Sequence, residues 1–432
     1  MQALKKWLME RNEGLEGILF LLGVFFKPFY LFPSGTVGLA DLCFAFSALI
    51  LLGRRLKRRQ NLGIEREDWL LWIFLISVCL VNAIWFFLRR EQEYIVFTIY
   101  WIYGVMVIWS FRQMGGRRGI CLGVKSVLKV SLLLQMIFLI TGIGRIYYEY
   151  WGATRYMGTF NNPNQMAYVI FLMLLLLHFY EEDKRRFWCY GIIAGILIAA
   201  TKSTGVFLGW ACLALFDSVS ALYRFSRKNK KYKKIWLLFW LIICVAGVAA
   251  LWAIWPSADF QIENTDYSLK ARIQEKIYKL WTGGAQGLIY DRGWERLILY
   301  PKYLLFGAGE GDYGRFPLSE WKSEIHSTFL SIWFYYGTIP LAFFLIWLYR
   351  NVKRNFYHDW PVYAALFFEC MTVINYRQPF FWMVILAGGV IQKGRRSGGN
   401  NEERNRVMAK MDKTGRERSR YKGRTGKHFW ER

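Results

Sequence analysis

His326 is the side chain best suited to moving a proton. It stands where a polar segment gives way to the apolar run STFLSIWFYYGTIP. An imidazole with a pKa near 6.5 can accept a proton at neutral pH, so His326 could act as a general base. The histidines at 178, 358 and 428 fall on what we expect to be the opposite side of a membrane. The competing interpretation is a histidine that caps a helix at the membrane interface.

Four cations could bind an anion: Arg155, Lys202, Arg292 and Arg296. A guanidinium group matches phosphate oxygens through two parallel hydrogen bonds. Lys202 lies in the short break ATKSTG between two apolar runs, where a lone ammonium would need an anionic partner. Each cation alone could be an interfacial anchor. Several of them on the same side as one histidine favour a site for a phosphorylated substrate.

A glycine-rich segment, GAGEGDYGRF, precedes the histidine and carries Gly307, Gly309 and Gly311. Such glycines let the backbone approach a ligand or another helix closely. They are not a dinucleotide fingerprint, because no βαβ unit surrounds them. The seven cysteines form no CxxC pair, and no Asp, Glu or His cluster on the outer side has ligand spacing. We therefore expect neither a metal nor a cofactor.

The elements that must position these residues are membrane helices. The chain has 432 residues, 55% of them hydrophobic, in continuous blocks of about 20, the length that crosses a bilayer. Apolar blocks of this length exclude a soluble enzyme. Because apolar and polar residues do not alternate within the blocks, a β-barrel is excluded as well. The sequence predicts an all-α polytopic membrane protein. Twelve spans are expected, at about 15–33, 37–53, 69–88, 94–111, 120–141, 163–180, 187–201, 203–222, 235–255, 326–349, 360–376 and 378–392.

The basic residues predict the topology. With the N-terminus inside, 39 of the 57 Lys and Arg residues fall on the cytoplasmic side and 15 on the outer side. The positive-inside rule therefore predicts a multi-pass cell-membrane protein with both termini cytoplasmic. The basic runs then face anionic lipid, and we expect no nucleic-acid binding, because no folded nucleic-acid module accompanies them.

The chain divides into two parts. Residues 1–392 form the transmembrane catalytic domain, with a large outer loop, 256–325, inserted before the tenth span. That loop should hold one helix near 267–281 and another that begins with Asp291 as its N-cap. We expect residues 393–432 to form a basic, disordered cytoplasmic tail. Two embedded ion pairs are expected as well, Lys27 with Asp41 and Glu369 with Arg377.

In their order along the chain, these segments resemble the bacterial O-antigen ligase and O-antigen polymerase superfamily. They are most like Gram-positive capsular or exopolysaccharide polymerases. The resemblance rests on RYMGTFNNPN (155–164), TKSTG (201–205), DRGWERLILYPKYLLFGAGEG (291–311) and EIHSTFLSIWFYYGTIP (324–340). The motifs cover about a quarter of the chain, and each is loose. Their order and spacing carry the specificity.

The resemblance implies a GT-C-type glycosyltransferase. Such an enzyme carries a glycan from an undecaprenyl-pyrophosphate-linked donor to an acceptor hydroxyl at the outer face, without nucleotide sugar or metal. His326 matches the histidine taken as the base. Arg155 and Arg292 match arginines that would hold the pyrophosphate, with Arg296 an alternative to Arg292. Lys202 stands where many members have arginine. A lysine keeps the positive charge but cannot form the two parallel hydrogen bonds of a guanidinium group.

Polymerase is the reading favoured within this superfamily. Ser327 follows the histidine where many ligases have asparagine, so a polymerase that extends a lipid-linked oligosaccharide is expected. A ligase with another acceptor is the alternative. A flippase of lipid-linked oligosaccharides is the non-enzyme alternative, and it would need polar groups at the bilayer midplane. The expected partners are the bilayer, undecaprenyl-pyrophosphate-linked oligosaccharides, a flippase and a chain-length regulator.

Overall fold

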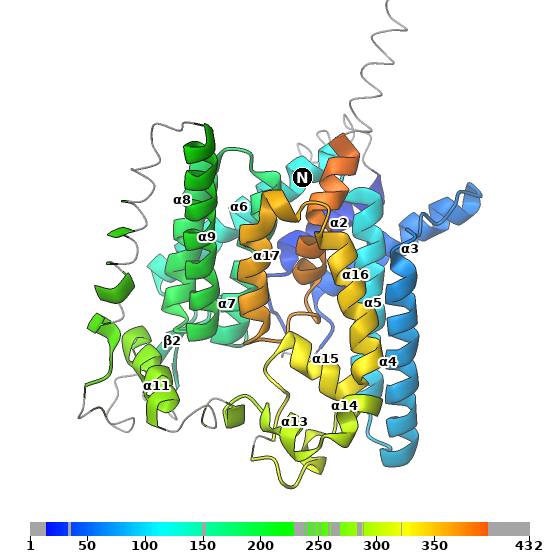
Figure 1. Cartoon of the computed structure of the whole chain (residues 1–432). Helices are drawn as coiled ribbons and strands as arrows, with labels where there is room; N and C mark the ends of the chain where they lie inside the picture. Colours follow the sequence, from blue (N-terminus) through cyan, green and yellow to red (C-terminus); the bar gives the residue numbers. More distant parts are fainter. Residues whose placement is uncertain are drawn as a thin grey trace, which may run out of the picture.

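The protein folds as a bundle of helices (Figure 1). The structure, a computed structural model, describes residues 14–32, 36–148, 153–228, 268–282, 289–320 and 322–395, together with Phe260, Gly287 and parts of 238–257. In chain order the elements are α2 (Leu15–Phe26), α3 (Leu39–Lys57), α4 (Asp68–Arg89), α5 (Glu93–Met114), α6 (Arg118–Thr141), β1 (Arg145–Tyr148), β2 (Ala153–Tyr156), α7 (Pro163–Tyr180), α8 (Lys184–Ala200), α9 (Thr204–Lys228), α11 (Leu269–Thr282), α13 (Glu295–Leu299), α14 (Lys302–Phe306), η4 (Tyr313–Arg315), α15 (Thr328–Tyr336), α16 (Thr338–Val352) and α17 (Phe356–Cys370). A further helix covers 379–395.

The prediction of an all-α membrane protein is confirmed at this level. Among the described residues, five helices are long and apolar enough to cross a membrane: α4, α5, α6, α7 and the first 22 residues of α9. Each predicted block other than 235–255 overlaps a described helix, although several helix ends differ from the prediction. About half of that block, and the whole tail after residue 395, lie outside the described residues.

Two expectations about helix boundaries are wrong. The run predicted as one span over 326–349 is broken at Gly337, where φ is +92° and a Cβ atom would come within 2.4 Å of the Leu305 carbonyl oxygen. Hydropathy continues across this break, so the sequence pattern hides it. The helix expected to begin at Asp291 is shorter: α13 has Trp294 as its N-cap, because 291–294 form a turn with Gly293 at positive φ.

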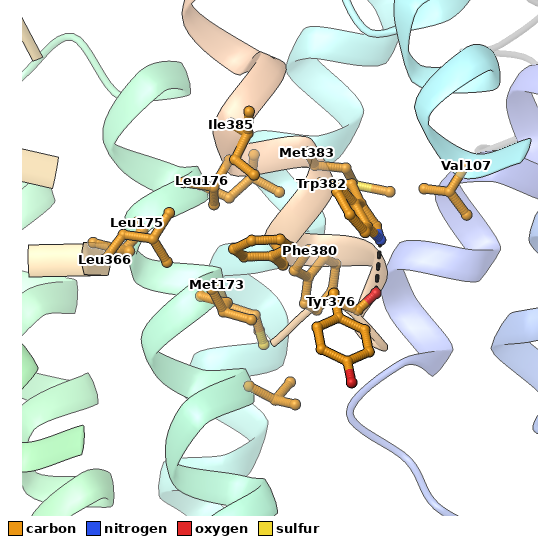
Figure 2. Packing of buried hydrophobic residues seen from close by; sticks show 14 of the residues in the cluster. Val107, Met173, Leu175, Leu176, Leu366, Tyr376, Phe380, Trp382, Met383 and Ile385 are labelled. Atoms are coloured by element: carbon orange, nitrogen blue, oxygen red, sulfur yellow. Dashed lines mark hydrogen bonds between the residues drawn. The ribbon is translucent and has the colours of Figure 1, made fainter. Parts of the chain in front are cut away.

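The core is centred on α7. Every residue from Val169 to Leu177 is apolar and buried, so this helix is covered on all sides by other helices. Figure 2 shows Met173, Leu175 and Leu176 of α7 beside the helix over 379–395. By contrast, α4 exposes Ile73, Ile76, Leu80 and Ile84, as expected for a helix that faces lipid.

The segments with the predicted site residues gather at one end of the bundle. The β1–β2 hairpin, α11, α13 and the break between α15 and α16 all lie at the lower end in Figure 1. The basic loops predicted to be cytoplasmic join helices at the other end. The alternation of helix directions therefore separates the predicted site from the basic loops.

Candidate functional site

A cavity of about 1130 Å³ lies at the end of the bundle where these segments meet. It brings together three of the predicted residues, Arg155, Arg292 and His326, which are far apart in sequence. The other lining cations are Lys27, Arg272, Lys276, Lys279 and Arg377, and the lining carboxylates are Asp41, Glu275, Asp291 and Glu324. Many charged side chains therefore line the cavity, among apolar ones from the surrounding bundle.

Arg155 joins two of the predicted motifs. It lies on β2, which pairs antiparallel with β1. Its Nε donates to the Thr201 carbonyl oxygen at 2.9 Å, and its Nη2 donates to Asn164 Oδ1 at 2.7 Å. Asn162 caps the start of α7 by accepting from the Asn164 amide. The Gly-Thr-Phe motif and the break between α8 and α9 are thus fixed to each other through a single guanidinium group.

Arg292 and His326 are held together through their backbones. The His326 amide donates to the Arg292 carbonyl oxygen at 2.9 Å, and Trp294 Nε1 donates to the His326 carbonyl oxygen at 3.3 Å. The Arg292 side chain extends toward the 371–378 loop, where its Nη1 donates to the Thr372 carbonyl oxygen at 3.0 Å. A segment before α13 and the segment before α15 therefore form one wall of the cavity.

The surroundings of His326 favour a neutral imidazole. Burial lowers the pKa of His326 below its ordinary value, and the positive charges of Arg292 and Arg377 lower it further, while Glu324 opposes them. A neutral ring can accept a proton at neutral pH. The N-cap of α15 is Ser327, whose Oγ accepts from the Leu330 amide at 3.3 Å. The helix cap that was the competing role for the histidine is therefore provided by its neighbour.

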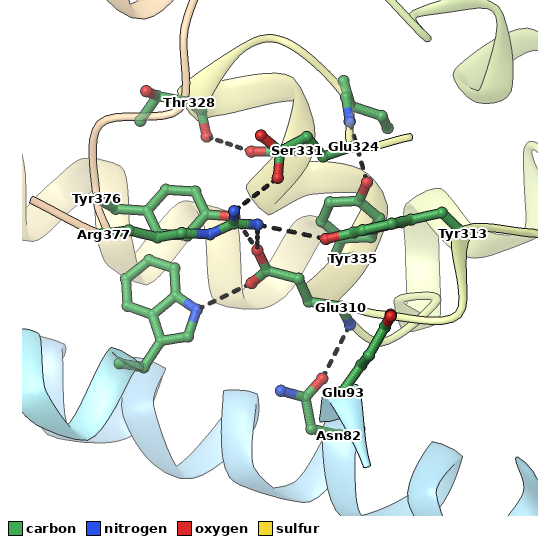
Figure 3. Close-up of polar contacts among 12 residues, drawn as sticks. Asn82, Glu93, Glu310, Tyr313, Glu324, Thr328, Ser331, Tyr335, Tyr376 and Arg377 are labelled. Atoms are coloured by element: carbon green, nitrogen blue, oxygen red, sulfur yellow. Dashed lines mark hydrogen bonds and ion pairs between the residues drawn. The ribbon is translucent and has the colours of Figure 1, made fainter. Parts of the chain in front are cut away.

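Sequence reasoning missed the place of Glu324 in this cavity and the partners of Arg377. Arg377 Nη1 donates to Glu324 Oε2 and Nη2 donates to Glu310 Oε1, both at 2.6 Å (Figure 3). The expected pair with Glu369 is wrong, since Glu369 instead accepts from the Asn375 amide group. Burial would raise the pKa of Glu324, but the attraction of Arg377 holds it below its ordinary value. The only sequence signal for Glu324 was its position two residues before His326.

Glu310 is a buried centre of hydrogen bonds behind Arg377. It is completely buried, accepts from the Tyr376 hydroxyl at 2.6 Å and donates its amide to Asn82 Oδ1 at 3.0 Å. Figure 3 shows Asn82 reaching this network from α4. The buried carboxylate is thus supplied with donors from several elements, as a buried charge requires.

The glycine-rich segment packs against protein and does not line the cavity. Gly307, Gly309 and Gly311 all have positive φ. A Cβ atom on Gly307 would come within 2.7 Å of the Tyr335 carbonyl oxygen, and one on Gly309 within 2.7 Å of the Trp85 ring. These glycines could let the backbone approach either a ligand or another helix. In the structure they let it approach neighbouring helices.

The other two predicted cations, Lys202 and Arg296, do not line the cavity. Lys202 follows the C-cap of α8 with φ of +54°; its neighbours Ser203 and Thr204 line the cavity, whereas Lys202 itself is not among the lining residues. Arg296 is fully buried away from the cavity, where its Nε donates to Ser319 Oγ at 3.0 Å. Between the two alternatives for the loop arginine, Arg292 is the one that faces the cavity.

The expected pair of Lys27 and Asp41 is confirmed in the cavity wall. Lys27 Nζ lies 2.9 Å from Asp41 Oδ1, which also accepts from the Tyr103 hydroxyl at 2.7 Å. Across the described residues, no group of three or more His, Cys, Asp or Glu side chains is arranged to hold a metal ion.

Comparison of the chain with models of known protein families and with curated proteins finds no match.

Proposed function

We propose that the protein is a polysaccharide polymerase of the GT-C type. It would transfer a glycan from an undecaprenyl-pyrophosphate-linked donor to a hydroxyl of a lipid-linked oligosaccharide at the outer membrane face. The observation that carries the proposal is the convergence of His326, Arg155 and Arg292 in one polar cavity at one end of a membrane bundle. The excess of basic residues at the other end supports an extracytoplasmic site and twelve spans with both termini inside.

The reaction is a direct displacement at the anomeric carbon of the donor. The acceptor oxygen forms a bond to that carbon while the bond from the carbon to the pyrophosphate oxygen breaks. His326 accepts the proton from the acceptor hydroxyl, as its lowered pKa permits. Arg155 and Arg292 stabilise the negative charge that develops on the departing undecaprenyl pyrophosphate. Lys202 would add positive charge from the edge of the cavity.

The structure gives less support to a flippase. A flippase moves a polar headgroup through the bilayer and needs polar groups at mid-membrane depth. The central helix α7 presents only apolar side chains from Val169 to Leu177, whereas the polar cavity lies at one end of the bundle. A ligase remains the alternative within the enzyme class, since it would use the same donor site with another acceptor.

Replacing His326 with alanine tests the proposal. We expect His326→Ala to lower the rate of polymer formation by about 10²–10⁴-fold, because a positioned acid–base group contributes that much. Expression and binding of undecaprenyl pyrophosphate should stay near wild type, since the base acts on the acceptor. The measurement is polymer length and amount on a gel beside lipid binding by purified protein.

The matched control is His358→Ala. The side chain of His358 is 75% exposed and lies at the other end of the bundle, so this variant should make polymer normally. Long polymer from His326→Ala at close to the wild-type rate would show that the catalytic assignment is wrong.

A further inference from the structure

The helix α11 turns one charged face toward the cavity. Arg272, Glu275, Lys276 and Lys279 all line the cavity, and their spacing of three, four and seven residues places them on one side of a helix. Trp281 is 75% exposed, and its ring lies 5.6 Å from that of Trp255. Exposed tryptophans beside a basic helical face are typical of a helix that lies in the membrane interface.

Two carboxylates hold the lysines of this face in place. Lys276 Nζ and Lys279 Nζ lie 2.9 and 2.7 Å from Asp291 Oδ2, and Lys279 Nζ lies 3.0 Å from Glu275 Oε1. An ammonium group has three donors, and each lysine side chain is still 25% exposed. The lysines are therefore prepositioned and can still donate to an anion in the cavity.

The face of α11 is separate from the anion site already described but adjoins it. Asp291, which holds the two lysines, directly precedes Arg292 in the chain. With Arg272, the α11 face has three cations against the two carboxylates Glu275 and Asp291, so a net positive charge remains. The cavity is larger than the roughly 300–1,000 Å³ of most small-molecule sites, so it has room for more than one headgroup.

We propose that this face of α11 binds the pyrophosphate headgroup of a second lipid-linked molecule, the acceptor, while Arg155 and Arg292 hold the donor. The inference rests on the proposed function and extends it. A polymerase joins two lipid-linked molecules, and two pyrophosphates in one cavity repel each other unless each has its own cations. The interfacial position of α11 lets a headgroup reach the lysines while its lipid tail stays in the bilayer.

Counting bound lipids tests the inference. We would add undecaprenyl pyrophosphate without sugar to the full chain in detergent and measure occupancy by native mass spectrometry. The wild type should bind two molecules. The variant Lys276→Gln/Lys279→Gln should bind one, with the second affinity weakened about tenfold or more, as for lost hydrogen bonds to a charged group. Arg155→Gln/Arg292→Gln should also bind one.

The controls separate charge from folding and from lipid type. Lys276→Arg/Lys279→Arg keeps the charge and should still bind two molecules. Lys270→Gln makes the same charge change on the exposed side of α11 and should behave as wild type. Phosphatidylglycerol should not displace the second molecule. Equal competition by it would overturn the proposal in favour of an ordinary membrane lipid.

The two hypotheses fail in different ways. One bound molecule in the wild type, lost only in Arg155→Gln/Arg292→Gln, would overturn the acceptor site and leave the donor site standing. Two bound molecules in Arg155→Gln/Arg292→Gln would instead remove the support for the proposed donor site.

Discussion

Arg292 and Arg377 line the same cavity but are held by different partners. Arg377 donates to the carboxylates of Glu310 and Glu324, each at 2.6 Å. Arg292 donates to the carbonyl oxygen of Thr372, and within the described chain no carboxylate forms an ion pair with it. Its neighbour Asp291 is engaged by the lysines of α11. One guanidinium is therefore neutralised by the protein, and the other keeps its charge for a ligand.

For these two arginines, which both line the cavity, the difference in partners separates the structural cation from the functional one. A buried ion pair fixes elements relative to each other, and Arg377 connects the glycine-rich segment, the segment before His326 and the 371–378 loop. A cation with neutral partners is positioned yet still attracts an anion. Removing Glu310, the fully buried partner of Arg377, should chiefly change stability, whereas removing Arg292 should chiefly change catalysis.

The largest effect is expected from Glu310→Ala. Breaking a buried ion pair by removing one partner typically costs about 3–5 kcal/mol, because the other charge stays buried. Glu310 is completely buried, so its loss should lower the unfolding temperature in detergent strongly. Glu182→Ala is the matched control, since Glu182 is 76% exposed in its pair with Arg395 and should contribute about 0–1 kcal/mol. Equal unfolding temperatures for the two variants would contradict the structural role.

Arg292→Ala should affect the reaction more than the fold. Removing one group that stabilises developing negative charge typically lowers turnover about 10²–10³-fold. Binding of undecaprenyl pyrophosphate should weaken as well, because the anion is present before the bond breaks. Arg292→Lys should recover only part of both, since it keeps the charge and loses the fork. The measurement is the rate of polymer formation and the lipid affinity of each variant at an unchanged unfolding temperature.

The comparison also shows what the sequence could and could not predict. Block length predicted the apolar helices, whereas the topology predicted from the basic residues stays a prediction. The convergence of Arg155, Arg292 and His326 followed from placing their loops on one side of the membrane. The break at Gly337 was missed because both flanking helices are apolar, so no change in composition marks it.

The sequence also failed to predict contacts between residues that are far apart in the chain. Arg377 was expected to pair with Glu369, eight residues away, but its partners lie 53 and 67 residues away in sequence. Such contacts depend on how loops fold back over the bundle, and local pattern carries no information about that.

Glu324→Gln should shift the pH dependence of the reaction. The Glu324 carboxylate raises the pKa of His326, whereas Arg292 and Arg377 lower it. Removing this negative charge therefore lowers the pKa of His326. The positive charge of Arg377, no longer paired with Glu324, lowers the pKa of His326 further. Because the base works when neutral, the acid limb of the rate profile should move to lower pH. Glu320→Gln, an exposed change outside the cavity, should leave the profile unchanged, and a shift to higher pH in Glu324→Gln would contradict the assignment of His326.

The smallest effect is expected from a chelator. If Arg292 and Arg155 stabilise the departing pyrophosphate, a divalent cation is not needed for that role, and excess EDTA should change the rate less than about twofold, well below the roughly 10²–10³-fold expected for losing one such group. The same reasoning predicts that Mg²⁺ will not rescue Arg292→Ala, because the lost guanidinium acts from a fixed position set by its hydrogen bond to the Thr372 carbonyl oxygen. The measurement is polymer formation by purified wild type and Arg292→Ala with EDTA, and then with Mg²⁺ in excess over EDTA. Loss of wild-type activity on chelation with recovery in Mg²⁺ would mean that a metal ion compensates the leaving group, and the contrast between Arg292 and Arg377 would then lose its catalytic meaning.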